Sequence, residues 1–330
     1  MFSLRGWSDF SEMERESHSA RAAFILACAA CLFLIALVAG RPTPLPYQAP
    51  ASPPPWTHEP IMPVPEVPKL DRRKVAMGRD LFNDPRLSGR GDMPCARCLD
   101  IQSNGTTNQS FGLKTNTPTV FNAALSSRLG WSGHDRTLED QALATLQSGI
   151  ISKGVPFSVI LERLRMDRNL DARFIEIFGR RADARAVAEA LAAYERTLVT
   201  PGSRFDRWLW GDNRALGDRE VRGYKSFKKL GCAACHQGQN VGGNMFQKNG
   251  IFRPVGPQKP RILRVPSLRN VAETPPYFHD GSAPTLLAAV RRMAVAQLDI
   301  DISPDEAMDI VHFLRSLTGS YEGAPVRAAQ

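Results

Sequence analysis

Two cysteines three residues apart, followed at once by a histidine, stand at Cys232, Cys235 and His236 in the run CAACH. This spacing is the attachment motif of a c-type haem: the thiols form thioether bonds to the porphyrin, and the imidazole supplies an axial nitrogen to the iron. A zinc half-site or a redox dithiol is the alternative, but no second ligand pair completes a zinc site. The sequence therefore predicts one covalently bound haem c.

A second, imperfect copy of this motif lies upstream. Cys95 and Cys98 have the same spacing, but Leu99 follows them, and leucine cannot bind iron. Because haem attachment normally depends on the histidine, two alternatives stay open: a short disulfide in an oxidising compartment, or a haem held by thioether bonds with an unusual ligand. We expect no stable haem here, and keep Cys95 and Cys98 as a candidate second attachment site.

An uncharged apolar stretch over residues 22–40 has about the minimum length for a membrane-spanning helix. A cleaved signal peptide is the alternative. Arg5, Arg15 and Arg21 precede the stretch, so residues 1–21 are expected to stay in the cytoplasm. The prediction is a periplasmic protein anchored to the inner membrane by a single N-terminal transmembrane helix.

The rest of the chain is expected to be mainly α. Residues 41–68 are rich in proline, which predicts an extended linker that does not pack as a domain. Beyond it, Asp71, Thr137, Thr285 and Ser303 each stand where a helix N-terminus is expected, and no long alternating pattern predicts a sheet. Each downstream cysteine pair has its own set of helices, which indicates two similar domains joined near residues 200–215.

The chain carries a net charge of +9, and basic residues crowd just before the CAACH motif. A solvated helix face is one interpretation. The other is a docking surface that steers an acidic electron donor to the haem edge. No nucleic-acid recognition motif accompanies the charge, so a nucleic-acid partner is not expected. The basic residues are Arg219, Arg222, Lys225, Lys228 and Lys229.

From residue 69 to 320 the sequence resembles the bacterial di-haem cytochrome c peroxidases and their relatives, the MauG proteins. The resemblance implies two cytochrome-c-like domains, 69–205 and 206–330, with a haem in each and a calcium ion between them. It also implies that electrons enter at the C-terminal haem and pass through a tryptophan to the N-terminal haem, where hydrogen peroxide is reduced. The matching stretches are KVAMGRDLFNDPRLSG, TPTVFNA, TLEDQA, LAAYERTLVTPGSRFDRWLWGD, GCAACHQG, VPSLRNVAETPPYFHDGSAPTL and VHFLRSLTG.

The resemblance assigns roles to single residues. Met293 matches the sixth iron ligand, although its helical spacing alone would make it a core residue. Trp131 matches the tryptophan between the haems and Gln141 a glutamine of the peroxide pocket; each has a plain alternative, as a core and a surface residue respectively. Asn116, with Thr274 and Pro276, matches the calcium ligands, which are hard oxygen donors. Asn116 capping a turn is the alternative there. His279 is expected to be a hydrogen-bonded structural histidine.

The N-terminal site departs from the family pattern. Leu99 replaces the proximal histidine, Leu113 stands near the place of the opposite histidine, and Ile151 falls where the family has its catalytic glutamate. Peroxide cleavage needs an open iron site and a group that moves a proton between the oxygens, and neither leucine nor isoleucine supplies these. His134 is a conceivable substitute ligand, but a lone histidine is more often structural.

The first hypothesis is a c-type haem oxidoreductase of this family, with the C-terminal haem taking electrons and the N-terminal domain using them for peroxide reduction or partner oxidation. The alternative is a single-haem electron-transfer protein whose N-terminal site has lost peroxidase activity. The third hypothesis is a thiol redox protein using Cys95 and Cys98. It is the weakest of the three, because no thioredoxin-like pattern surrounds the pair. The expected electron donor is a small, acidic cytochrome or cupredoxin, and the acceptor is hydrogen peroxide or a partner protein.

Overall fold

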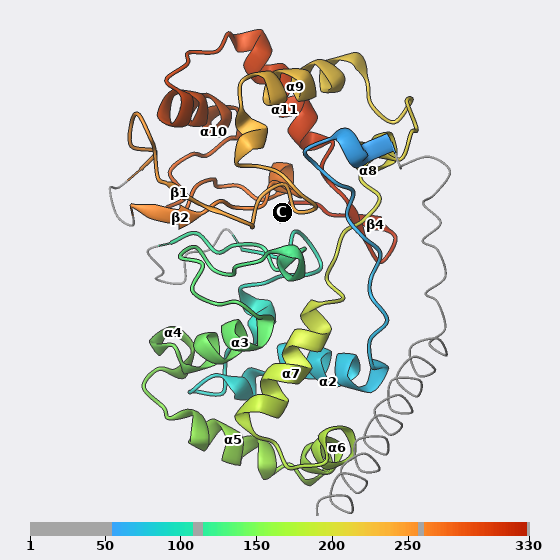
Figure 1. The fold of residues 1–330 in the computed structure, drawn as a ribbon. Helices are drawn as coiled ribbons and strands as arrows, with labels where there is room; N and C mark the ends of the chain where they lie inside the picture. Colours follow the sequence, from blue (N-terminus) through green and yellow to red (C-terminus); the bar gives the residue numbers. More distant parts are fainter. Residues whose placement is uncertain (1–54, 108–114, 257–260, 329–330) are drawn as a thin grey trace, which may run out of the picture. The chain divides into compact units, whose positions relative to one another are not determined.

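The computed structural model describes residues 55–107, 115–256 and 261–328, which lie within one compact unit. Helices dominate this part of the chain and fall into an N-terminal and a C-terminal group, so the prediction of a mainly α fold is confirmed (Figure 1). The N-terminal group comprises α2 (Arg72–Phe82), η2 (Pro85–Leu87), η3 (Cys95–Arg97), η4 (Ala123–Leu125), α3 (Leu138–Gln147), α4 (Gly149–Ser152), α5 (Phe157–Arg165), α6 (Arg168–Phe178) and α7 (Ala184–Glu195).

The C-terminal group holds the second set of helices and two pairs of short strands. In the described residues, β1 pairs with β2 and β3 with β4, both antiparallel, and no larger sheet forms. The elements are α8 (Arg204–Leu209), α9 (Asp218–Lys229), η5 (Cys232–Ala234), β1 (Phe246–Lys248), β2 (Ile262–Arg264), η6 (Val271–Glu273), α10 (Leu286–Met293), the π-helix η7 (Ala294–Leu298), α11 (Pro304–Arg315), β3 (Ser320–Tyr321) and β4 (Ala324–Pro325).

Helices α2 and α7 cross at close range in the N-terminal half. Asp71 begins α2, because its carboxylate accepts a hydrogen bond of 2.9 Å from the backbone N–H of Arg73. Gly78 lies at the crossing, where a Cβ would overlap the carbonyl oxygen of Ala190 on α7. Glycine is therefore what lets the two helices approach this closely.

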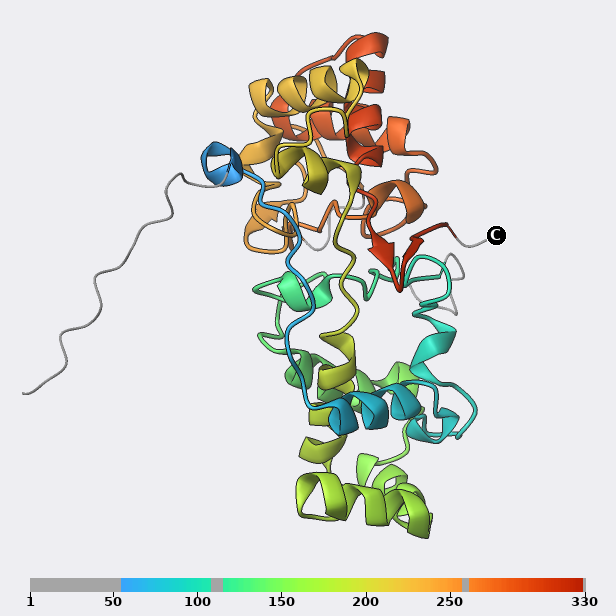
Figure 2. The same cartoon turned by 90° about the vertical axis from the view of Figure 1, so that its right-hand side faces the viewer.

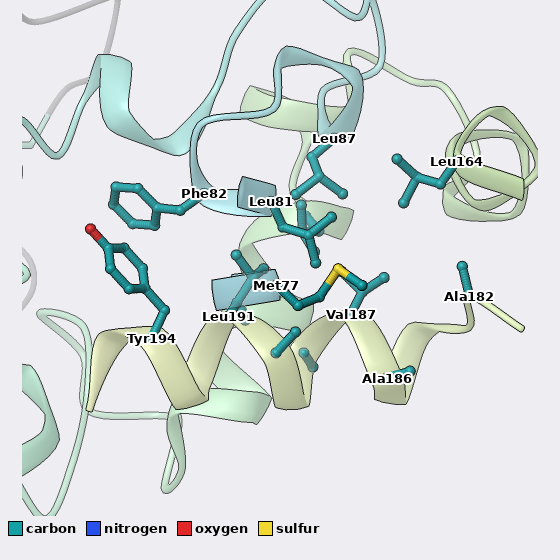
Figure 3. Packing of buried hydrophobic residues seen from close by; sticks show 14 of the residues in the cluster. Met77, Leu81, Phe82, Leu87, Leu164, Ala182, Ala186, Val187, Leu191 and Tyr194 are labelled. Carbon is teal, nitrogen blue, oxygen red and sulfur yellow. The ribbon is translucent and has the colours of Figure 1, made fainter. Parts of the chain in front are cut away.

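The core of this half lies between the same two helices (Figure 3). Met77 and Leu81 on α2 face Val187 and Leu191 on α7, and none of the four is more than 2% exposed. Val187 and Leu191 are four residues apart, so they lie on the same face of α7. Burying such side chains stabilises the fold by roughly 1.5–3 kcal/mol each.

The C-terminal half repeats this crossing with α9 and α11. Ser303 begins α11 by accepting a hydrogen bond of 3.2 Å from the N–H of Glu306, as the sequence predicts. Gly223 on α9 meets the backbone of Asp309 on α11, and a Cβ at Gly223 would overlap that carbonyl oxygen. The two halves therefore share one construction, in which a helix before a cysteine pair crosses the last helix of the group (Figure 2).

Buried polar side chains join the two halves. Asn122 donates to the hydroxyl of Thr200 at 2.7 Å and accepts from the N–H of the same residue at 2.9 Å. Asn270 donates to this hydroxyl at 3.0 Å and accepts from the N–H of Gly319 at 2.9 Å. Asn122 and Asn270 both adopt the left-handed conformation that asparagine tolerates, and each precedes a short 3-10 helix, η4 or η6.

The end of the chain also crosses between the halves. Tyr321 on β3 packs its ring against Phe121, with 5.2 Å between the ring centroids. Val326, 3% exposed, belongs to the core cluster of the N-terminal half. Part of the segment predicted as C-terminal domain therefore completes the N-terminal core.

The end of the proline-rich segment is not an unpacked linker, and this corrects the expectation for residues 41–68. Ile61 is fully buried, and Val64 is 6% exposed and donates its N–H to Asp206 at 3.2 Å. The carbonyl oxygen of Met62 accepts a hydrogen bond of 2.7 Å from Arg269. Prolines prevent regular structure here but do not prevent burial, since the backbone finds its partners in the C-terminal half.

The predicted transmembrane helix at 22–40 and the cytoplasmic segment 1–21 lie outside the described residues, as does Leu113. Within residues 55–107, 115–256 and 261–328, no helix has both the length and the apolar character needed to cross a bilayer.

Candidate haem-binding site

The motif turn of the C-terminal half arranges both thiols and the imidazole. Gly231, in the left-handed conformation with φ 89°, ends the chain segment after α9 and starts η5. The N–H groups of Cys235 and His236 both donate to the carbonyl oxygen of Cys232, at 3.2 and 3.0 Å. This tight turn holds Cys232 and Cys235, three residues apart, on one turn of the chain, and His236 follows at once.

His236 is oriented for metal binding. Its Nδ1 lies 3.3 Å from the carbonyl oxygen of Val241, and because a carbonyl only accepts, Nδ1 carries the proton. Nε2 is then the free nitrogen, and a hydrogen-bonded partner behind a ligand histidine fixes the ring in this way. Burial lowers the pKa of His236 to about 4, so the ring is neutral at pH 7, the form that binds iron.

A cavity of about 300 Å³ opens in front of this imidazole. Cys232, Cys235, His236 and Met293 all line it, and Met293 is the last residue of α10. Burial raises the pKa of the Cys232 thiol to about 11, as expected in apolar surroundings. Two thiols, a neutral imidazole and a thioether around one apolar space are the donor set that a haem c requires, so these residues fit the group. Other lining residues are Phe227, Leu230, Leu268, Tyr277, Leu286, Val290, Ile302, Ile310 and Leu314.

Residues of the N-terminal half reach the same cavity. Trp131 and Gln141 both line it, and Gln141 is half-buried. The indole N–H of Trp131 donates to the carbonyl oxygen of Asn116 at 2.7 Å. The ring of His279, 6% exposed, lies edge-on to Trp131 with 6.2 Å between centroids. The backbone carbonyl oxygen of His279 accepts from the Asn116 N–H at 2.7 Å.

The three residues matched to a calcium site lie close together. The side-chain amide of Asn116 is 2.5 Å from the carbonyl oxygen of Pro276, and Asn116, Thr274 and Pro276 all line the cavity. Asn116 therefore bridges the two halves instead of only capping a local turn. The described residues hold no cluster of three or more histidine, cysteine or acidic side chains that would suit a metal ion.

The turn of the N-terminal half lacks the imidazole. Cys95 and Cys98 lie on η3 and its C-cap, and both are free thiols, so the disulfide alternative is not what the structure contains. Cys95, Leu99 and Ile151 pack against the core of this half. His134, the conceivable substitute ligand at the N-terminal site, is exposed, and it does not line the C-terminal cavity.

Two charged residues near these sites were not singled out by the sequence. Arg264, 7% exposed, lines the cavity. Glu195 ends α7 near Cys95, and burial raises the pKa of its carboxyl to about 8. The signal was a charged side chain inside an apolar run, ILRVP for Arg264 and AAYERTLV for Glu195. A charged residue inside an apolar run indicates a charge close to the core, and such charges normally have a partner.

Comparisons with known proteins agree with this geometry. The family model described as di-haem cytochrome c peroxidase matches residues 72–214, and the one described as cytochrome c matches residues 220–318. A cytochrome c551 peroxidase of Nitrosomonas europaea is 36% identical over 286 residues, which cover 79% of this chain and 85% of that protein. The methylamine utilization protein MauG of Methylorubrum extorquens is 32% identical, over 78% of this chain and 81% of its own.

A solved structure has the same fold. It is the crystal structure of a MauG-like protein associated with microbial copper homeostasis, with a TM-score of 0.66 and 24% identity, covering 83% of this chain and 95% of that one. The resemblance noted in the sequence is confirmed, and these relatives favour the c-type haem oxidoreductase over the single-haem electron-transfer protein. The chain belongs to the di-haem cytochrome c peroxidase and MauG family of c-type haem oxidoreductases.

Proposed function

We propose that the protein is a peroxidase-type oxidoreductase that takes single electrons at a haem c in the C-terminal cavity and passes them to the N-terminal half. The acceptor is hydrogen peroxide or a partner protein. The observation that carries the proposal is that one cavity is lined both by the cysteines and histidine of the CAACH motif and by Trp131 and Gln141 of the other half. Relatives named cytochrome c551 peroxidase and MauG support the reaction class.

In this proposal four residues around the cavity would hold the haem. Cys232 and Cys235 would form the thioether bonds, and His236 and Met293 would bind the iron. A haem with these two ligands supplies one-electron chemistry at a raised potential, since a neutral thioether favours ferrous iron. Val241 keeps the imidazole in its metal-binding tautomer through the bond to Nδ1. The apolar side chains exclude water from the group.

Trp131 is proposed as the link to the N-terminal half. Its indole is held by the bond to Asn116 and by the edge contact with His279, so the ring has a fixed place at the cavity wall. Gln141, on α3, is proposed as the amide that faces the acceptor side. Cys95 and Cys98 are the candidate attachment site of a second haem, where Leu99 offers no nitrogen.

Calcium is proposed between the halves, with Asn116 and the backbone carbonyls of Thr274 and Pro276 as ligands. The side-chain amide nitrogen of Asn116 lies 2.5 Å from the carbonyl oxygen of Pro276. Rotation of the side chain would exchange this nitrogen with Oδ1, so that Oδ1 would face that carbonyl oxygen. Oxygen donors from both halves are what calcium prefers. Removal of calcium would then loosen Asn116 and, through it, the indole of Trp131.

The electron donor is proposed to be a small acidic cytochrome or cupredoxin in the periplasm, with the protein anchored to the inner membrane by residues 22–40. On α9, Lys225 and Lys229 are exposed, and no ion pair occupies them in the described part of the chain. Arg219 and Arg222 both pair with Asp309, so only part of the basic cluster is free for a partner. Phe227 of the same helix lines the cavity, which supports α9 as the helix on which a donor would dock.

The test uses full-length, haem-loaded protein reduced with a chemical donor and mixed with hydrogen peroxide. We expect reoxidation of the haem absorbance, with peroxide consumed in proportion. A reduced haem that peroxide fails to reoxidise would refute the peroxidase, and failure with every small donor protein as well would refute the oxidoreductase. Haem per chain, from pyridine haemochrome absorbance, tells from the same sample whether Cys95 and Cys98 hold a second haem.

A further inference from the structure

Arg264 is a buried arginine without an acidic partner. It ends β2, is 7% exposed and lines the cavity beside the haem-attachment residues. Its Nε donates to the carbonyl oxygen of Gly130 at 2.8 Å. No carboxylate of the described residues lies within 4.0 Å of the guanidinium, and burial alone lowers its pKa. The two terminal nitrogens form a fork suited to a carboxylate, and no acceptor for them is found among the described residues.

The other deeply buried arginine of this half is fully partnered, which makes the contrast clear. Arg269 is 2% exposed, and its guanidinium lies 2.8 Å from the carboxylate of Asp206. It also donates to the carbonyl oxygens of Gln239 and Met62, at 2.8 and 2.7 Å. An uncompensated buried charge costs several kcal/mol, so a buried arginine normally has such partners. The described part of the chain therefore leaves Arg264 without the anion that a buried arginine normally has.

The lining of the cavity indicates what that anion is. Among the described residues, no aspartate or glutamate lines the cavity, and the two charged residues that line it are both basic, Lys248 and Arg264. Asn249 also lines it, and the Nδ2 of this residue is buried with no acceptor. A space with cations and free donors but no carboxylate suits an anionic group carried by its occupant.

We infer that Arg264 is the anion receptor of this cavity and that it binds a propionate carboxylate of the haem c held by Cys232 and Cys235. The inference rests on the proposed haem in this cavity. A haem carries two propionates on one edge of the porphyrin, and a fork of two guanidinium N–H groups binds a carboxylate in a bidentate pair. The ion pair would restore the charge balance that the chain alone leaves open.

This assignment gives Arg264 a positioning role as well as a charge. Its backbone N–H donates to the carbonyl oxygen of Trp131 at 2.9 Å, and its side chain holds Gly130, the residue before Trp131. The propionate edge of the haem would thus be tied to the segment that carries the proposed inter-haem tryptophan. A cation at this edge also favours ferrous iron, because it repels the more positive ferric centre more strongly than the ferrous one.

The test measures the reduction potential of the haem-loaded protein by spectroelectrochemistry, in Arg264→Met, Arg264→Lys and Lys248→Met. We expect Arg264→Met to lower the potential and Arg264→Lys to keep most of it, because lysine retains the charge without the fork. Lys248→Met is the matched control: it removes a second cation of the cavity lining, but an exposed one, and should shift the potential far less. Equal shifts in Arg264→Met and Lys248→Met would overturn the assignment, as would equal losses of thermal stability in both Arg264 variants with no change in potential.

A crystal structure of the wild-type holoprotein covers the case in which Arg264→Met fails to mature. A propionate oxygen within hydrogen-bond distance of the Arg264 guanidinium supports the inference. A haem bound to Cys232 and Cys235 with both propionates elsewhere overturns the inference and leaves the proposed function standing. Purified, matured protein without haem at these cysteines refutes the proposed function itself.

Discussion

The two halves present the same cysteine turn with different fifth residues. In the C-terminal turn the N–H of His236 donates to the carbonyl oxygen of Cys232 at 3.0 Å, and in the N-terminal turn the N–H of Leu99 donates to that of Cys95 at 3.1 Å. Both turns contain a short 3-10 helix, η3 or η5. The backbone that presents two thiols is therefore independent of the histidine, whereas the capacity to bind iron depends on that single side chain.

The surroundings of the two turns differ in the same sense. His236 faces a cavity and is held by Val241, while Leu99 packs against the hydrophobic core of its half. Burial raises the pKa of Cys95 to about 12 and that of Cys232 to about 11, so both thiols have apolar environments. An apolar side chain at position 99 is stabilised by this packing, whereas it offers no nitrogen to a metal.

Exchanging the fifth residue between the turns should have the largest effect. Leu99→His completes a second attachment motif, and we expect haem content to rise by about one per chain. His236→Leu removes the axial nitrogen of the C-terminal site, and we expect loss of most of its haem. Pyridine haemochrome absorbance against protein mass measures both.

The double variant is the control for expression and maturation, since it keeps one complete motif and should return haem content to about one per chain. Unchanged haem content in Leu99→His, in protein that folds normally, would mean that the N-terminal half holds its haem already or has no room for one. Either result would end the interpretation of Leu99 as the decisive difference between the halves.

The glycines at the helix crossings should have the next largest effect. A Cβ at Gly78 or Gly223 would overlap a backbone carbonyl oxygen of the facing helix, and backbone atoms cannot move aside as a side-chain tip can. We expect Gly78→Ala and Gly223→Ala each to cost about 3 kcal/mol or more of unfolding free energy, by denaturant titration.

Gly149→Ala is the matched control for these two substitutions, because nothing lies within 4 Å of a Cβ there and the glycine is at the start of α4. It should be neutral or slightly stabilising. A small loss of unfolding free energy in one variant and a large loss in the other would show that the two crossings contribute differently to stability, although their backbones are alike.

Much of this comparison could be predicted from local sequence. The caps at Asp71 and Ser303 are decided within three residues, and the CAACH motif within five, so the sequence alone predicts them. The burial of Ile61 and the lack of an acidic partner for Arg264 depend on residues far along the chain. Pairing over such separations leaves no local pattern, and the proline-rich composition around Ile61 even indicated the opposite.

Met293 tests the C-terminal side of the comparison. Replacing it with alanine removes the proposed thioether ligand, so the potential should fall by part of the roughly 0.8 V range that axial ligands span. The vacated position should also bind cyanide, visible as a shift of the Soret band. Met245→Ala, at a half-buried methionine that does not line the cavity, is the control and should change neither property. An unchanged potential in Met293→Ala would remove Met293 from the proposed ligands.

Glu195 tests the N-terminal side, where α7 ends on a carboxyl while α11 ends on the exposed Arg315. Burial raises the pKa of Glu195 to about 8 in the folded protein, from an ordinary value near 4.5. The folded state then keeps a proton that the unfolded chain releases, so wild-type stability falls as pH rises from about 4.5 to about 8. Glutamine stays neutral, so Glu195→Gln should flatten this slope and gain roughly 1–3 kcal/mol of unfolding free energy at pH 8, less than full linkage because the side chain is only half-buried.

Arg315→Gln is the control, because it removes a charge at the corresponding end of α11, and it should leave the slope as it is. Urea titrations at several pH values decide the matter: a wild-type slope that survives in Glu195→Gln would mean that this carboxyl is ionised and solvated, and that the two helix ends differ in sequence but not in energetic consequence.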